Sequence, residues 1–304
     1  MLWAGLSLRT LPFMDVVERY SLLLRTTEDG TLRLLNRVLD QSFNRLVRRA
    51  RVHMRAGYVD PSQRNLALLQ EFRNLVPAFR PDRIDSYDTL LRNLVGEAGT
   101  RGIEVASNLT EQMRPGRPRV DVSIPLEATA AAAAQSKGYL RKHGERFATT
   151  SAEIVAQGVA EGRPTSSMIQ DMRSRLGVVK ARAEAIVRTE SLRAYNDASN
   201  TYYATQGIDL CMWYATADDR SCDICAPRAG QLYKRAEIKA PCHPRCRCYL
   251  APWDADLAAI DADYAGQRER HTKEVSAAVA RLSPELVNLN RAAVFEQLAP
   301  VPVT

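Results

Sequence analysis

The residues best suited to chemistry are cysteines and a histidine gathered in one short stretch. The chain has six cysteines, and five of them lie between positions 222 and 248, with one of the four histidines. The candidates are Cys222, Cys225, Cys242, His243, Cys246 and Cys248. In a C-x2-C pair, two sulfurs on one tight turn can face a single ion about 2.3 Å away, as tetrahedral zinc requires. With a second cluster supplying further ligands, the spacing predicts a zinc knuckle.

Six candidates compete for four coordination places. The predicted metal ligands are Cys222, Cys225 and His243, with Cys246 or Cys248. Cys242 ranks last, because adjacent side chains rarely both reach one ion. Two other interpretations stay open: a disulfide pair or free buried thiols, and a redox dithiol at the C-x2-C pair. A four-ligand zinc site is closed to water, and no HExxH-like helical arrangement accompanies it, so we expect a structural ion and no catalytic residues.

This stretch resembles the phage Mu F-like family of minor head proteins, also called phage head morphogenesis proteins. The resemblance covers roughly residues 180–252 and is specific in order and spacing. Among the residues that carry it are Arg188, Thr189, Glu190, Asn196, Trp213, Arg220, Cys222, Cys225, Gly230, Pro241, His243, Pro244, Cys246, Arg247 and Cys248. The chain departs from the family at Ala240, where many members have a second proline, and at Cys242, an additional thiol.

The resemblance implies a structural minor capsid protein of a tailed phage that acts near the portal vertex in procapsid assembly. The implied partners are the portal protein and the major capsid or scaffold protein, with packaged double-stranded DNA as a further candidate. The implied location is the virion, and the host cytoplasm during assembly. No enzymatic activity is expected. The alternative is a zinc-dependent nucleic-acid-binding protein or nuclease, because Cys/His knuckles also support those functions. The remaining histidines are too scattered to nominate a nuclease site.

The elements that must position these residues are mostly helical. Hydrophobic periodicity and breakers predict a mainly α fold, with a small antiparallel β and zinc-knuckle module (α+β) near the C-terminal third. The expected helices are 14–56, 62–76, 86–113, an alanine-rich helix from 125 toward 146, 150–161, 166–176, 179–206, 255–264 and 267–281, with a last segment beginning at 283. The expected strands are 210–215, 230–233 and 247–251. Trp213 is expected in the core and Cys211 as a buried, small apolar side chain.

Helix 179–206 carries polar residues expected to support the knuckle. Thr189, Arg193, Asn196 and Asn200 share one face at helical spacing, and Arg188 and Glu190 flank the first of them. A catalytic constellation would need a nucleophile paired with a histidine, which this face lacks. We therefore assign a structural polar face, made of Arg188, Thr189, Glu190 and Asn196, whose members bond the backbone of the knuckle.

The chain length and the position of a proline-rich run suggest how the chain divides into domains. A chain of 304 residues favours about two domains. The basic, proline-rich run at 114–119 is the best linker. We predict an N-terminal helical domain at 1–118, a Mu F-like domain with the knuckle at 119–253, and a C-terminal helical segment and tail at 254–304.

Composition adds weaker constraints. The formal net charge is +7 and arginine dominates the basic residues, which suits contact with nucleic acid or an acidic partner but also follows from a GC-rich genome. No apolar run reaches 18 residues, so no transmembrane helix and no membrane partner are expected. The opening residues do not form a convincing signal peptide, and cysteines in a cytoplasmic product favour metal binding over disulfides.

Overall fold

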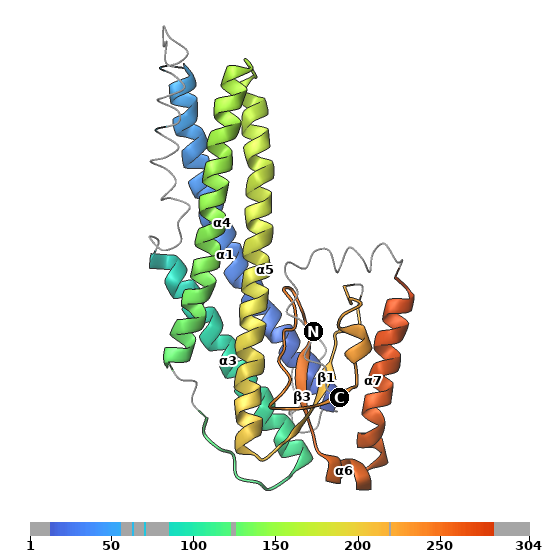
Figure 1. Ribbon diagram of the computed structural model, residues 1–304. Helices are drawn as coiled ribbons and strands as arrows, with labels where there is room; N and C mark the ends of the chain where they lie inside the picture. Colours follow the sequence, from blue (N-terminus) through green and yellow to red (C-terminus); the bar gives the residue numbers. More distant parts are fainter. Residues whose placement is uncertain are drawn as a thin grey trace. The chain divides into compact units, whose positions relative to one another are not determined.

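The computed structural model describes residues 13–55, 63, 70, 85–122, 126–218 and 220–282. Figure 1 labels most of its elements. In chain order they are α1 (Phe13–Arg55), α3 (Asp85–Met113), α4 (Leu126–Ala160), α5 (Thr165–Thr205), β1 (Leu210–Tyr214), the short helix η4 (Ala226–Arg228), β2 (Leu232–Lys234), β3 (Tyr249–Trp253), α6 (Ala255–Ile260) and α7 (Ala262–Ala280). The described chain is mainly helical with one small sheet, which confirms the predicted fold class. The helix expected over 62–76 and the segment from 283 fall outside the described residues, apart from isolated positions.

Two predicted helix breaks are wrong. α4 continues through the expected gap before Thr150, and α5 continues through the one after Leu176. A helix tolerates a single glycine, and a Cβ added at Gly177 would meet nothing within 4 Å. The break between α4 and α5 is confirmed, because Gly162 has a φ of 66° and Pro164 stands directly before α5.

The three strands form one antiparallel sheet in the order β2-β1-β3. Met212 is opposite Leu232 on one side and opposite Ala251 on the other. Every residue of β3 is buried, so this strand is covered on both faces. Trp213 and Cys211 are each 0% exposed, which confirms their predicted places in the core.

The chain divides into two compact units, each assembled from separate stretches. Unit 1 comprises the described parts of 1–28, 94–129 and 188–304, and unit 2 those of 29–93 and 130–187. The unit 1 core includes Val16, Leu109, Tyr203, Trp213 and Val275. The unit 2 core includes Leu39, Phe43, Phe147, Met172 and Leu176. The predicted domain limits at 118/119 and 253/254 stay predictions. Among the described helices, none has both the length and the hydropathy needed to cross a bilayer.

Candidate metal centre

Two tight turns of unit 1 carry the cysteines and the histidine. In the first, the carbonyl of Cys222 accepts a hydrogen bond from the backbone N–H of Ala226 at 3.0 Å, and the chain runs on into η4. In the second, the carbonyl of His243 accepts from the N–H of Cys246 at 3.2 Å. Arg245, within this turn, has a φ of 60°, a left-handed conformation that reverses the chain direction. The two turns are remote in sequence but present their thiols to the same space.

Four side chains meet closely enough to hold one ion. The ligand atoms of Cys225, Cys242, His243 and Cys246 all lie within 4.8 Å of one another. The sulfur of Cys225 is 3.8 Å from that of Cys242 and 3.7 Å from that of Cys246. Sulfurs bound at about 2.3 Å to a tetrahedral zinc ion stand roughly 3.8 Å apart, so these separations fit zinc.

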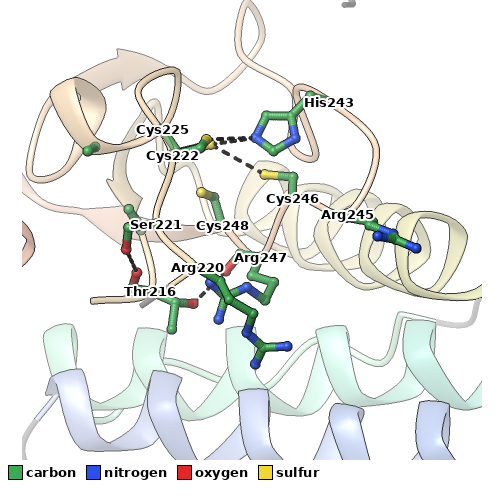
Figure 2. Close-up of a pocket in the computed structure, with 12 residues that line it drawn as sticks. Thr216, Arg220, Ser221, Cys222, Cys225, His243, Arg245, Cys246, Arg247 and Cys248 are labelled. Atoms are coloured by element: carbon green, nitrogen blue, oxygen red, sulfur yellow. Dashed lines mark hydrogen bonds between the residues drawn. The ribbon is translucent and has the colours of Figure 1, made fainter. Parts of the chain in front are cut away.

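The other two candidates lie against this group. The sulfur of Cys222 is 3.2 Å from Nε2 of His243, and that of Cys225 is 3.0 Å from the same nitrogen. Cys248 lines a cavity of about 20 Å³ beside the cluster, which has room for about one water. Figure 2 shows the sulfurs of Cys222 and Cys225 directed toward His243 and that of Cys246 directed toward Cys225, with Cys248 alongside. All six candidates are buried.

The residues predicted as ligands thus converge, and so does Cys242, which the sequence ranked last. Its backbone and that of His243 form a bend. Adjacent side chains on a strand point to opposite faces, but a bend removes that restriction. Which four of the six bind metal stays a prediction.

Hydrogen bonds between the cysteine thiols and the His243 ring shift the pKa values of these groups. The hydrogen bond with Cys225, followed by that with His243, lowers the pKa of Cys222 to about 4, and the partner bond raises the pKa of Cys225. Burial disfavours a charged imidazole, but the bond to Cys222 and the negative charges of nearby thiolates raise the pKa of His243 to about 9. The cluster therefore favours thiolate and imidazolium together, and a bound cation would replace these shared protons.

Helix α5 holds both the second turn and β3. The hydroxyl oxygen of Thr189 accepts a hydrogen bond from the backbone N–H of Arg245 at 3.0 Å. Two turns further along the helix, the amide of Asn196 donates to the carbonyl of Cys248 at 3.2 Å and accepts from the N–H of Leu250 at 3.0 Å. Asn196 is 1% exposed, so these bonds replace water that cannot reach the groups.

The other residues of the predicted polar face have different partners. Arg188 donates to the buried Glu28 at 2.9 Å, and Ser191 donates to the same carboxylate, which ties α5 to the first part of α1. Glu190 is paired with Arg193 on its own helix. Burial raises the pKa of both carboxylates against the opposing effect of these partners. The structural role of this face stays a prediction, and two of its members, Thr189 and Asn196, bond the knuckle backbone.

An ion pair joins the segment after β1 to the chain that follows the second turn. Asp218 accepts from both terminal nitrogens of Arg247, and the hydroxyl of Thr216 donates to the carbonyl of Arg247 at 2.8 Å. The guanidinium groups of Arg220 and Arg245 extend away from the sulfurs in Figure 2. Residue spacing alone does not predict the pairing of Asp218 with Arg247, because the two residues meet only once the turns are folded.

The segment that carries the metal-site turns matches a known protein family. Residues 150–251 match the family described as Phage Mu protein F like protein. Over this segment the chain is similar to the phage Mu F-like family. The match supports a phage head morphogenesis family and confirms the resemblance found in the sequence. The Mu F-like segment begins in α4, includes all of α5 and ends in β3, so it contains both metal-site turns and their supporting helix. Comparisons with curated proteins and with solved structures gave no match.

Proposed function

We propose that this protein is a structural minor component of a phage head, built in near the portal vertex during procapsid assembly. The observation that supports this most is the coincidence of the Mu F-like segment with a buried Cys/His cluster tied to α5. The similarity to the Mu F-like family supports the assembly role. The Cys/His cluster gives a physical reason why this segment keeps one conformation.

The metal in this proposal is a structural zinc ion. The sulfur separations of 3.7 and 3.8 Å fit a tetrahedral site, and imidazole and thiolate are ligands that zinc prefers. The adjoining cavity of about 20 Å³ offers no space for a substrate. A zinc ion here would fasten the turn at Cys222–Cys225 to the turn at 242–248. Cys225, His243 and Cys246 belong both to the sequence-based set and to the converging group, so they are the ligands we propose first.

The proposed partners are the portal protein and the major capsid or scaffold protein. Double-stranded DNA is a further candidate, because the second half of α1 presents the exposed arginines Arg45, Arg48 and Arg51. Arginine binds phosphates in a sequence-independent way, and such binding weakens steeply as salt rises. A salt-sensitive mobility shift of duplex DNA that is lost when these arginines become glutamine would support this part.

Co-expression with portal, scaffold and major capsid proteins from the same genome tests the proposal. The wild-type chain should co-sediment with assembled shells. Cys225→Ala should not, whereas the matched control Cys211→Ala should, because Cys211 is a buried thiol on β1 outside the cluster. A wild-type chain absent from every shell, or one that cleaves plasmid DNA with added divalent metal, would overturn the assignment.

A further inference from the structure

A groove in unit 1 lies between the first part of α1 and the end of α7. It has a volume of about 540 Å³. Residues following β1 line it as well. The two helices and the C-cap residue of α7, Arg281, contribute Glu18, Ser21, Leu22, Arg25, Glu274, Ala277 and Arg281.

The two helices that form the walls of the groove, α1 and α7, run in the same direction. The ring of Phe13, at the start of α1, contacts the ring of Tyr264 near the start of α7, with centroids 5.9 Å apart. Further along both helices, residues 18–25 of α1 and 274–281 at the end of α7 line the same groove. The two helices therefore run in the same sense along the groove, from the Phe13–Tyr264 contact toward Arg25 and Arg281.

Both walls carry the same order of charge. On α1, Glu18 is followed seven residues later by Arg25, and at the end of α7 Glu274 is followed seven residues later by Arg281. Seven residues are two helical turns, so each acid and base are about 10 Å apart on the same face. The groove is thus acidic at one end and basic at the other. Ala277 and Leu22 lie between the two ends. Leu22 is 52% exposed, so it is accessible to a partner.

The charges are available to a partner. Within the part of the chain that the structure describes, Glu18, Arg25 and Arg281 form no ion pair. Glu274 lies 4.0 Å from Nδ1 of His271, but burial lowers the pKa of that ring to about 4, so the ring is neutral near pH 7. Asp218, also on the groove wall, is already neutralised by Arg247.

We propose that this groove binds a helical peptide segment of another protein, one that carries an acidic and a basic residue seven positions apart on one face with an apolar residue between them. Charge complementarity places the basic residue over Glu18 and Glu274 and the acidic residue over Arg25 and Arg281. An acidic residue near the N-terminus and a basic one near the C-terminus also suit the dipole of the incoming helix, which then lies antiparallel to both walls. Leu22 and Ala277 provide the apolar contact between the charged ends.

The proposal concerns a surface outside the zinc cluster and does not depend on head assembly, so a peptide experiment can succeed or fail whatever the shell assay shows. The probe is a fluorescent, alanine-rich helical peptide with Glu at one position, Leu four residues later and Lys seven residues after the Glu. Its controls replace the Glu and Lys by Gln, or replace the Lys by Glu. Anisotropy with the full chain at low salt should show the Glu/Lys peptide binding about tenfold more tightly than either control.

Matched protein variants locate the site. The double variant Glu18→Gln/Glu274→Gln should weaken binding of the Glu/Lys peptide about tenfold. Glu269→Gln should leave binding unchanged, because Glu269 is an exposed acid on the same helix, paired with Lys273 and outside the groove. Equal binding of the neutral peptide, or unchanged binding by the double variant, would overturn the proposal. So would self-association of the chain that the double variant abolishes, because the groove would then hold a second copy.

Discussion

Replacing Asn196 with alanine should loosen the knuckle from its supporting helix. The side chain of Asn196 makes two bonds to the β3 region, donating to the carbonyl of Cys248 and accepting from the N–H of Leu250. Alanine removes both bonds and leaves both backbone groups buried without these partners. The residue is fully inside the protein, so water cannot substitute without a local opening.

The loss of unfolding free energy can be worked out from the two backbone groups that lose their partner, the carbonyl of Cys248 and the N–H of Leu250. A buried donor or acceptor left without a partner costs about 1–3 kcal/mol, and part of that cost is recovered by relaxation. We therefore expect Asn196→Ala to lose about 3 kcal/mol of unfolding free energy. The matched control is Asn200→Ala, because Asn200 makes one longer, half-buried bond of 3.4 Å to the carbonyl of Arg235. That control should lose about 1 kcal/mol or less.

Hydrogen exchange of the Leu250 amide is the most direct assay, because it reports local opening even if the chain's two compact units unfold separately. A loss of 3 kcal/mol should speed exchange at Leu250 about a hundredfold in Asn196→Ala, with little change in Asn200→Ala. Unchanged protection of Leu250 in Asn196→Ala would refute the reasoning, because the bond would then contribute nothing to holding β3.

Three further outcomes are expected. Elemental analysis should find one zinc ion per chain in the wild type and in Cys211→Ala, and none in Cys225→Ala. Burial lowers the pKa of His271 to about 4 from its ordinary 6.5, so the stability it contributes is present above pH 6.5 and is lost as the pH falls toward 4, by up to about 3 kcal/mol. Urea unfolding of His271→Gln should lack this component. Gly102→Ala should cost about 2–4 kcal/mol, because its Cβ would meet a backbone carbonyl of α5 at 2.2 Å, whereas Gly138→Ala, in open space on α4, should stabilise the chain slightly.

These expectations have clear contrary results. Zinc retained at full stoichiometry by Cys225→Ala would remove that thiol from the ligand set, and single alanine variants of Cys222, Cys242 and Cys248 would then identify the two ligands that join His243 and Cys246. Identical pH profiles for the wild type and His271→Gln between pH 6.5 and 4 would mean that the ring is solvated. A melting temperature for Gly102→Ala equal to that of the wild type would mean that the helices separate without cost.

The sequence predicted that a Cys/His cluster exists, but it did not predict which cysteines lie closest together in it. Spacing alone indicates that two turns bring thiols and a ring together, because C-x2-C fixes the local geometry. Ranking Cys242 requires knowing that residues 242 and 243 form a bend rather than an extended strand, and that depends on contacts such as the one between Arg245 and Thr189. The place of each thiol around the ion is set by tertiary structure.

Helix positions were predictable where a strong breaker stands and less so elsewhere. Gly162 and Pro164 mark a real boundary, whereas the polar and glycine positions near 149 and 177 do not, because packing along the long helices outweighs weak local preferences. The hydrogen bonds made by Asn196 agree with an expectation from helical spacing. Arg188 shows the limit of such reasoning, since its partner Glu28 is 160 residues away in the chain.

The division of unit 1 into separate stretches has a consequence for synthesis. Residues 13–28 emerge from the ribosome well before the strands and α7, which complete their core. The apolar side chains of the early stretch must therefore wait, partly uncovered, until about residue 280 has been translated. Chaperone occupancy of nascent chains should accordingly remain high after residues 13–28 emerge and fall once α7 is free to dock.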